Sequence, residues 1–253
     1  MKDLYRWDNL TRPEIEKLRD EDAIVIIPLG ATEQHGPHLP VGTDALTAQA
    51  LAGMAARTLD ETYGRRAVVA PTIAVANSIH HMSFPGTITL RPETYMRMLL
   101  EYCECLAHHG FRKIVILNAH GGNVIPTETA IININEALGF PVYFMEHKLG
   151  GEKIFPEILE TQKGGIHACE KETSMMLALY PELVDPIYKE TKGGNVTKDN
   201  YPGPAKPYTF QRMEEKTDNG SVGNAYAATP EKGQRLVEVT VANVARIISE
   251  IWA

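Results

Sequence analysis

The sequence predicts an α/β fold, a single three-layer α/β/α domain with a mainly parallel central sheet. Short runs rich in Val and Ile alternate along the chain with stretches of helical periodicity, the pattern typical of strand–helix–strand units. These runs are apolar throughout, as expected of strands covered by helices on both faces. The chain has 253 residues, a length typical of one long α/β domain. Because it contains no repeat or low-complexity tract, we assign residues 1–253 to that one domain.

Four strands are expected in this sheet. The first, with the sequence AIVIIPL, and the third, KIVILN, are continuous β-branched and apolar runs of the length of a buried strand. The other two are shorter apolar segments between helical stretches. The predicted strands are Ala23–Leu29, Ala67–Val75, Lys113–Asn118 and Pro141–Met145.

Five helices are expected between and after the strands. The second has proline near its start and Gly110 just past its end, which are typical boundary residues. The predicted helices are Ala45–Leu59, Pro92–His109, Val124–Leu138, Glu170–Tyr180 and Pro230–Ile251. Residues 186–226 are rich in Gly, Pro, Asn, Lys and Tyr without a clear period, and we expect a lid or interface segment there.

Composition excludes several classes of protein. Hydrophobic residues make up 43% and charged residues 23%, which excludes a disordered protein or a coiled coil. The net charge of −7 argues against nucleic acid or an anionic membrane as a partner. No apolar run reaches the roughly 20 residues of a transmembrane helix, and the charged amino terminus lacks the apolar core of a signal peptide. We therefore expect a cytoplasmic protein. Its 3 cysteines contain no CxxC pair, so neither a disulfide framework nor a cysteine zinc site is predicted.

Polar residues gather where the predicted strands end. In open parallel sheets, ligands bind beyond the carboxyl ends of the strands. The segments that follow the four strands, together with a later segment around residue 167, hold seven of the 9 histidines. These are His35, His38, His80, His81, His120, His147 and His167. We expect one edge of the sheet to collect them.

Metal binding is the chemistry that suits these residues. Glu33 and His35 form an acid-x-His pair on a loop held by Gly36 and Pro37, and Asp44 lies just before a helix. Imidazole and carboxylate ligands together match Zn²⁺, Mn²⁺ or Fe²⁺ better than Ca²⁺ or Mg²⁺. Several carboxylates beside several histidines favour a two-metal hydrolase with one bridging carboxylate.

Each of these residues also has a plainer interpretation. Asp44 could cap the helix that follows it, and His120 could stabilise the turn formed with the next two glycines. The adjacent His80 and His81 cannot easily face one metal from an extended backbone, so we expect at most one in the site. His108 and His109 are interpreted as surface residues near a helix end. In the segment HACEKETS, His167 and Glu172 could turn toward one site, or Glu172 could complement the helix amino terminus.

At these residues the sequence resembles the creatininase (creatinine amidohydrolase) family. The matching segments span most of the chain and read PLGATEQHGPHLPVGTD, FPGTITL, KIVILNAHGGN, HACEKETS and GNAYAATPEKGQ. The resemblance implies a three-layer α/β/α fold, two divalent metal ions per chain (Zn, Mn or Fe) and hydrolysis of C–N bonds in cyclic amides or formamides. It also implies a homohexamer or another homo-oligomer with a small-molecule substrate.

The resemblance also assigns site residues by position. Glu33, His35, Asp44 and His120 match the metal ligands of the family, with Asp44 in the bridging place, and His167 matches the histidine proposed as acid or base. Creatininase itself has a glutamate ligand where this chain has Gly122, and the tryptophans that flank creatinine have no counterpart. This indicates an HGGN-type branch rather than creatininase itself, with Glu172 as the replacement ligand and a further catalytic residue. We expect the substrate to be bound by Ser78, His81, Gly121 and Gly122.

Together with the resemblance, these residues predict a binuclear amidohydrolase in which a metal-bridging hydroxide attacks the carbonyl carbon. The amides of the Gly121–Gly122 turn would help to stabilise the oxyanion, and His167, with a pKa near 6.5, would protonate the leaving nitrogen. The same site could instead open a cyclic diketone by C–C hydrolysis or deformylate a nucleotide-like formamide. A non-catalytic metal- or metabolite-binding protein is the alternative from another class. A nucleotide-binding oxidoreductase is disfavoured because no GxGxxG motif follows the first strand.

Overall fold

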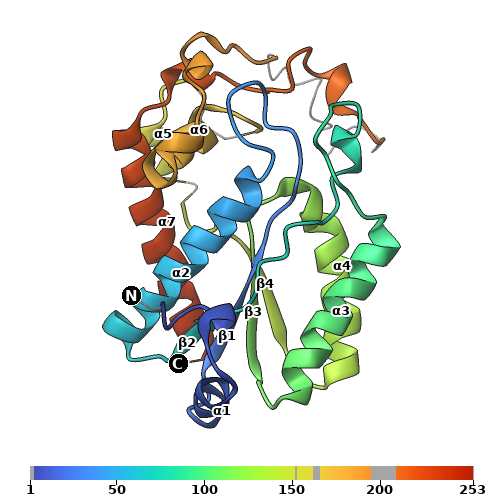
Figure 1. Ribbon diagram of the computed structural model, residues 1–253, viewed down its shortest axis with the longest axis vertical. Helices are drawn as coiled ribbons and strands as arrows, with labels where there is room; N and C mark the ends of the chain where they lie inside the picture. Colours follow the sequence, from blue (N-terminus) through green and yellow to red (C-terminus); the bar gives the residue numbers. More distant parts are fainter. Residues whose placement is uncertain (1–2, 152, 162–165, 195–208, 253) are drawn as a thin grey trace.

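The computed structural model describes residues 3–151, 153–161, 166–194 and 209–252. Its four strands form one parallel sheet with the order β2-β1-β3-β4, which confirms the predicted α/β class (Figure 1). The strands are β1 (Ile24–Leu29), β2 (Ala67–Val69), β3 (Lys113–Asn118) and β4 (Val142–Glu146). β2 is shorter than the predicted Ala67–Val75. Pro71 lacks an N–H group, and beyond it Ile73 makes only an isolated bridge to Leu29.

The helices lie on both faces of the sheet. Figure 1 shows α2 and α7 over one face and α3 and α4 over the other. The helices are α1 (Arg12–Asp20), α2 (Thr43–Tyr63), α3 (Pro92–His108), α4 (Val124–Leu138), α5 (Phe155–Ile158), α6 (Glu170–Leu179) and α7 (Pro230–Ile251). Of these, α1 and the single turn α5 were not expected from the sequence. Within the described residues, no helix is long and apolar enough to span a bilayer.

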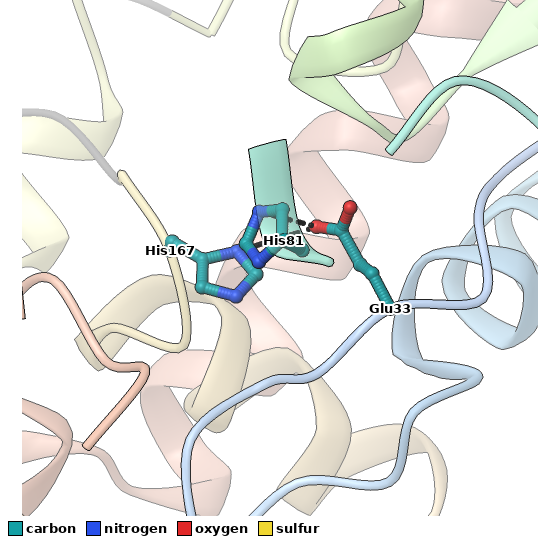
Figure 2. A group of neighbouring side chains, drawn as sticks. All are labelled: Glu33, His81 and His167. Atoms are coloured by element: carbon teal, nitrogen blue, oxygen red, sulfur yellow. Dashed lines mark ion pairs between the residues drawn. The ribbon is translucent and has the colours of Figure 1, made fainter. Parts of the chain in front are cut away.

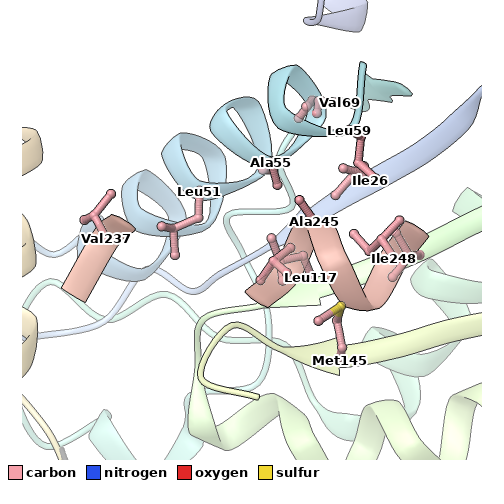
Figure 3. Packing of buried hydrophobic residues seen from close by; sticks show 14 of the residues in the cluster. Ile26, Leu51, Ala55, Leu59, Val69, Leu117, Met145, Val237, Ala245 and Ile248 are labelled. Carbon is pink, nitrogen blue, oxygen red and sulfur yellow. The ribbon is translucent and has the colours of Figure 1, made fainter. Parts of the chain in front are cut away.

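The two faces of β1 supply the two main hydrophobic cores. Ile26 packs toward α2 and α7 (Figure 3), and Ile24 belongs to the same cluster. Val25 and Ile27 pack on the side of α3 and α4. All six residues of this strand are buried. The continuous apolar run is thus explained by a strand that has no solvent-facing side.

The register of the sheet brings the ends of three strands to one edge. Leu29 of β1 is paired with Asn118 of β3, and Asn118 is paired with Glu146 of β4. The strands are parallel, so the chain leaves all three at the same level and on the same edge. The segments that carry the predicted site residues therefore begin side by side.

Residues 186–226 are described only in part. Three short 3₁₀ turns lie in this segment, at Pro186–Glu190, Met213–Glu215 and Ala225–Ala227. The predicted lid or interface role also covers residues 195–208, which lie outside the described residues.

Candidate metal centre

Acidic and histidine side chains from distant parts of the chain meet at the carboxyl edge of the sheet. The loop after β1 brings Glu33 and His35, and the first turn of α2 brings Asp44. A turn at Ile79–His81 follows β2, and His120 follows β3. His167 and Glu172 come from the start of α6. The structure thus brings together every acid and histidine for which we predicted a metal or catalytic role.

Asp44 lies between two histidines. One carboxylate oxygen, Oδ1, is 3.2 Å from Nε2 of His35, and the other, Oδ2, is 3.0 Å from Nδ1 of His120. The side chain is 5% exposed. No side-chain hydrogen bond caps the amino terminus of α2. The carboxylate therefore faces the cluster instead of capping its helix.

Glu33 contacts three imidazoles, two of which Asp44 does not contact. Its Oε1 is 3.2 Å from Nε2 of His81 and 3.5 Å from Nδ1 of His167 (Figure 2). Its other oxygen, Oε2, is 3.3 Å from Nε2 of His120. Both Glu33 and Asp44 thus contact His120, from opposite sides of its ring.

The cluster contains buried polar atoms without a hydrogen-bond partner among the described residues. These atoms are Oε2 of Glu33, Nε2 of His35, Oδ2 of Asp44 and Oε2 of Glu172. Leaving such atoms unpaired is costly. Four overlapping groups of three residues offer ligand atoms within 4.8 Å of one another, drawn from Glu33, His35, Asp44, His80, His81, His120, His167 and Glu172. A mixed set of imidazoles and carboxylates fits a divalent transition metal.

Backbone carbonyls orient the rings. Nδ1 of His35 is 3.0 Å from the Glu33 carbonyl, and Nε2 of His120 is 3.0 Å from the Asn77 carbonyl. We assign an N–H to each of these nitrogens because a carbonyl can only accept. The opposite nitrogen of each ring faces Asp44, and on the neutral ring it would offer a lone pair, the arrangement typical of metal-ligating histidines.

The amide of Gln34 sets the tautomer of His81. The Gly36 N–H donates to Oε1 of Gln34 at 2.9 Å, so Nε2 is the amide nitrogen. This nitrogen donates to the Gly220 carbonyl at 3.0 Å and to Nδ1 of His81 at 2.8 Å. His81 therefore carries its proton on Nε2 and donates to Glu33, which orients this carboxylate. Sequence reasoning missed Gln34, whose position between Glu33 and His35 was the available signal.

The charges of the cluster shift its pKa values in opposite directions. Burial alone would raise the pKa of Glu33 and Asp44, but the neighbouring His120 and His35 hold both well below the usual range. Burial alone would lower the pKa of His35, but Asp44 outweighs it and raises the pKa to about 9. The same two carboxylates raise the pKa of His120. The carboxylates are thus ionised, as a metal ligand must be.

His167 and Glu172 differ from this pattern. Burial, followed by the positive charge of His35, lowers the pKa of His167 to about 3, below the value near 6.5 expected from the sequence. Nε2 of His167 lies 2.7 Å from the Gln34 carbonyl, so the neutral ring presents the lone pair of Nδ1 to the site. Burial raises the pKa of Glu172. His167 is therefore placed to accept a proton before it donates one.

The structure places other candidates differently from the sequence-based expectations. His80 and His81 both belong to the possible ligand groups, because they lie in a tight 3₁₀ turn and not on an extended backbone. His38 and His147 do not belong to these groups. Nε2 of His38 is hydrogen-bonded to the Thr173 hydroxyl at 2.8 Å, and His147 lies beside the buried Lys171. The Ser78 hydroxyl, 3.3 Å from Nε2 of His120, is buried behind that ring.

The cluster lies in a cavity of about 730 Å³. Among its lining residues are Glu33, Asp44, His80, His81, His120, Gly121, Gly122, His167 and Glu172. The residues Gly121–Asn123 form a 3₁₀ turn that leads into α4. The two glycines of the HGGN motif therefore border the space in which a ligand would sit.

Gly122 has no room for a side chain. A Cβ atom at this position would lie 2.4 Å from Nε2 of His120, 2.5 Å from the Asn77 carbonyl oxygen and 2.7 Å from Cε1 of His80. Any side chain here would therefore require the His120 and His80 rings and the backbone at Asn77 to move.

We expect Gly122→Ala to weaken metal binding, because the new methyl group displaces the His120 ring. The affinity for the metal should fall by about tenfold, the scale seen when the support of a ligand is disturbed. The control is Gly121→Ala, where a Cβ meets no atom within 4 Å. Equal metal contents in the two variants, measured by elemental mass spectrometry, would contradict this expectation.

Comparison with known proteins identifies the family. The model of the creatininase family, described as creatinine amidohydrolase, matches residues 8–248. The chain belongs to this family and has the fold of its metal-dependent hydrolases.

The curated relatives carry three different names. The mycofactocin precursor peptide peptidase of Mycolicibacterium smegmatis is 35% identical over 64% of this chain and 60% of its own length. The 3-dehydro-scyllo-inosose hydrolase of Thermotoga maritima is 30% identical over 70% of this chain and 57% of its own length. The creatinine amidohydrolase of Pseudomonas putida is 29% identical over 90% of both chains. The chain thus spans about three fifths of the length of the first two, and it is a member of a branch other than creatininase itself.

Solved structures share the whole fold. A candidate creatinine amidohydrolase from Bacteroides fragilis superimposes with a TM-score of 0.86 and 26% identity, covering 99% of this chain and 97% of that chain. A manganese form of creatininase gives a TM-score of 0.80 with 27% identity over 98% of both chains. A Zn–Zn form of a creatininase variant gives 0.81 at the same identity and coverage.

Proposed function

We propose that this protein is a binuclear metal-dependent amidohydrolase that cleaves a C–N bond of a small cyclic amide or formamide. The observation that carries the proposal is the convergence of buried atoms of Glu33, His35, Asp44 and Glu172 that make no hydrogen bond to any described residue, beside a cavity that Glu33, Asp44 and Glu172 line. Burying polar and charged atoms without partners destabilises a folded protein, and bound divalent ions would supply the missing partners.

The proposed ligands are Glu33, His35, Asp44, His120 and Glu172, with Asp44 between the two metal positions. Its two oxygens face different histidines, at 3.2 and 3.0 Å, which suits a bridging role. Two ions of zinc, manganese or iron, when bound, would polarise the carbonyl of the substrate and lower the pKa of water toward neutrality.

The remaining steps fall to side chains and amides of the protein. Nδ1 of His167 would take the proton of the attacking water and return it to the leaving nitrogen. The backbone amides of Gly121 and Gly122, in the cavity wall, would stabilise the oxyanion. His81 would keep Glu33 oriented through its Nε2–H.

Replacement of His167 by Asn should separate catalysis from metal binding. We expect the metal content to be retained and turnover to fall by about 10²–10⁴-fold, the usual contribution of a proton-transfer residue. Elemental mass spectrometry gives the metal content, and ammonia or formate release from creatinine, cyclic ureides and formamides gives turnover. Loss of metal in His167→Asn would instead assign this histidine as a ligand.

Two further hydrolytic reactions remain candidates for the same site. The name of the Thermotoga maritima relative, an inosose hydrolase, supports C–C hydrolysis of a cyclic diketone as an alternative. Deformylation of a nucleotide-like formamide is the other, and an assay panel that includes both substrate types distinguishes them. A homo-oligomeric assembly and a cytoplasmic location, both expected from the sequence, stay proposals that size-exclusion chromatography with light scattering and cell fractionation would test.

A further inference from the structure

The cavity extends well beyond the metal cluster. Its volume of about 730 Å³ lies within the range of pockets that hold drug-sized ligands, and it greatly exceeds what a ring the size of creatinine would fill. Part of its wall is apolar and comes from Ile79, Met96, Ile125, Phe210 and Met213. A substrate with an apolar body beside its scissile amide would therefore fit this space.

Lys216 is the one lysine or arginine among the described residues that line the cavity. Its side chain is half-buried. No hydrogen bond or ion pair joins its Nζ to any residue within the described ranges, and the neighbouring Glu215 is exposed and not within ion-pair distance. Burial lowers the pKa of this ammonium, and the more distant charge of Glu215 offsets that effect only in part.

The backbone holds Lys216 in a fixed place. The buried Met213 anchors a 3₁₀ turn, and its carbonyl accepts from the N–H groups of Lys216 at 2.9 Å and Thr217 at 3.1 Å. Four residues further on, the Gly220 carbonyl accepts from Gln34 at 3.0 Å. This segment is therefore attached to the loop that carries the metal ligands, and Lys216 has a defined position relative to them.

We propose that Lys216 binds an anionic group of the substrate, so that the substrate is an amide with an apolar body and a carboxylate remote from the scissile bond. An ammonium offers donors only, and its strongest partner is an ionised oxygen acceptor. The lysine on the cavity wall attracts such a group. The inference rests on the proposed hydrolase function, because it assumes that the amide is held at the metal cluster.

Two matched metal-binding probes test this inference on the manganese-loaded protein. One is the monohydroxamate of benzylsuccinic acid, and the other is its neutral primary amide. The hydroxamate of each probe should bind the metals and leave the second group to contact the wall. We expect the acid to bind about tenfold more tightly than the amide, the ratio of dissociation constants that one charge-assisted hydrogen bond contributes. Isothermal titration calorimetry measures both dissociation constants.

Variants separate Lys216 from other causes of this preference. Lys216→Met should bring the ratio of the two dissociation constants to about one without changing the metal content, and Lys216→Arg should retain most of the preference. The control Lys189→Met, at an exposed lysine outside the cavity lining, should behave as the wild type. A preference for the acid that survives in Lys216→Met would assign it to the metals and overturn the inference.

The outcomes also distinguish this inference from the proposed function. If both probes bind the wild type equally well, the role of Lys216 is wrong while the metal site stands. If the protein takes up no metal and binds neither probe, the proposed hydrolase mechanism fails and the inference fails with it.

Discussion

Asp44→Asn is expected to leave a folded protein that no longer holds its metals. The carboxylate faces both His35 and His120, so its loss removes a ligand from both proposed metal positions. We expect metal affinity to weaken by about 100-fold or more, beyond the effect of disturbing a residue that only supports a ligand. Elemental mass spectrometry after dialysis should then find no bound metal, and hydrolysis should fall to the background rate.

The control for this variant is Glu61→Gln. It removes one negative charge from the same helix at an exposed position, where the ion pair with Arg57 is 3.8 Å long and contributes little. Its metal content should equal that of the wild type. Circular dichroism would verify that Asp44→Asn is folded. A folded Asp44→Asn protein that retains a full complement of metal would overturn the assignment of Asp44 as the bridging ligand.

Gly233→Ala is expected to lower the free energy of unfolding more than any other variant proposed for this protein. This glycine lies in α7 where it crosses α6, and a Cβ at this position would lie 1.8 Å from the Ser174 carbonyl oxygen and 2.9 Å from Cβ of Ala178. Both contacts involve atoms close to the backbone, so the two helices must separate. We expect a cost of about 3 kcal/mol, or a Tm lower by about 6–12 °C for a chain of this size.

Gly53→Ala should have the opposite effect. This glycine also lies within a helix, α2, but a Cβ there meets no atom within 4 Å. Alanine should therefore gain about 0.5–1 kcal/mol through the lower entropy of the unfolded chain and better helix propensity. Differential scanning calorimetry compares the two variants. Similar Tm values for both would show that the helices adjust easily and would contradict the close crossing. Since Glu172 lies on α6, Gly233→Ala should also weaken metal binding.

The sequence predicted most regular elements because their signals are local. The continuous apolar runs identified three strands to within one residue at each end, and the helix between proline and Gly110 was assigned almost to its exact length. The helix α1 was missed because its residues were considered only as a charged terminus. Thr11 and Glu14 form a capping box there, with a proline in the first turn, and this pattern is visible in the sequence.

The site was predictable in its membership but not in its geometry. The carboxyl ends of parallel strands meet at one edge, so Glu33, His35 and His120 could be expected near one another. The sequence did not specify that His80 and His81 form a tight turn that lets both face Glu33. That turn depends on contacts with other segments, such as the hydrogen bond that the Ser78 N–H donates to the Thr89 hydroxyl.

Gln34 couples the catalytic loop to the cavity wall, and thus the chemistry to the substrate preference, which an enzyme designer would wish to alter separately. Its amide links the metal-ligand loop to the carbonyl of Gly220, and a Cβ at Gly220 would lie 1.9 Å from Oε1 of Gln34. A change at either position would disturb the chemistry and the substrate wall together. Residues 209–216, which precede the Gln34–Gly220 contact in this segment, contribute to the cavity wall. Substrate preference can therefore be diversified in that short stretch, by random libraries or by grafting, while the catalytic loop keeps its shape.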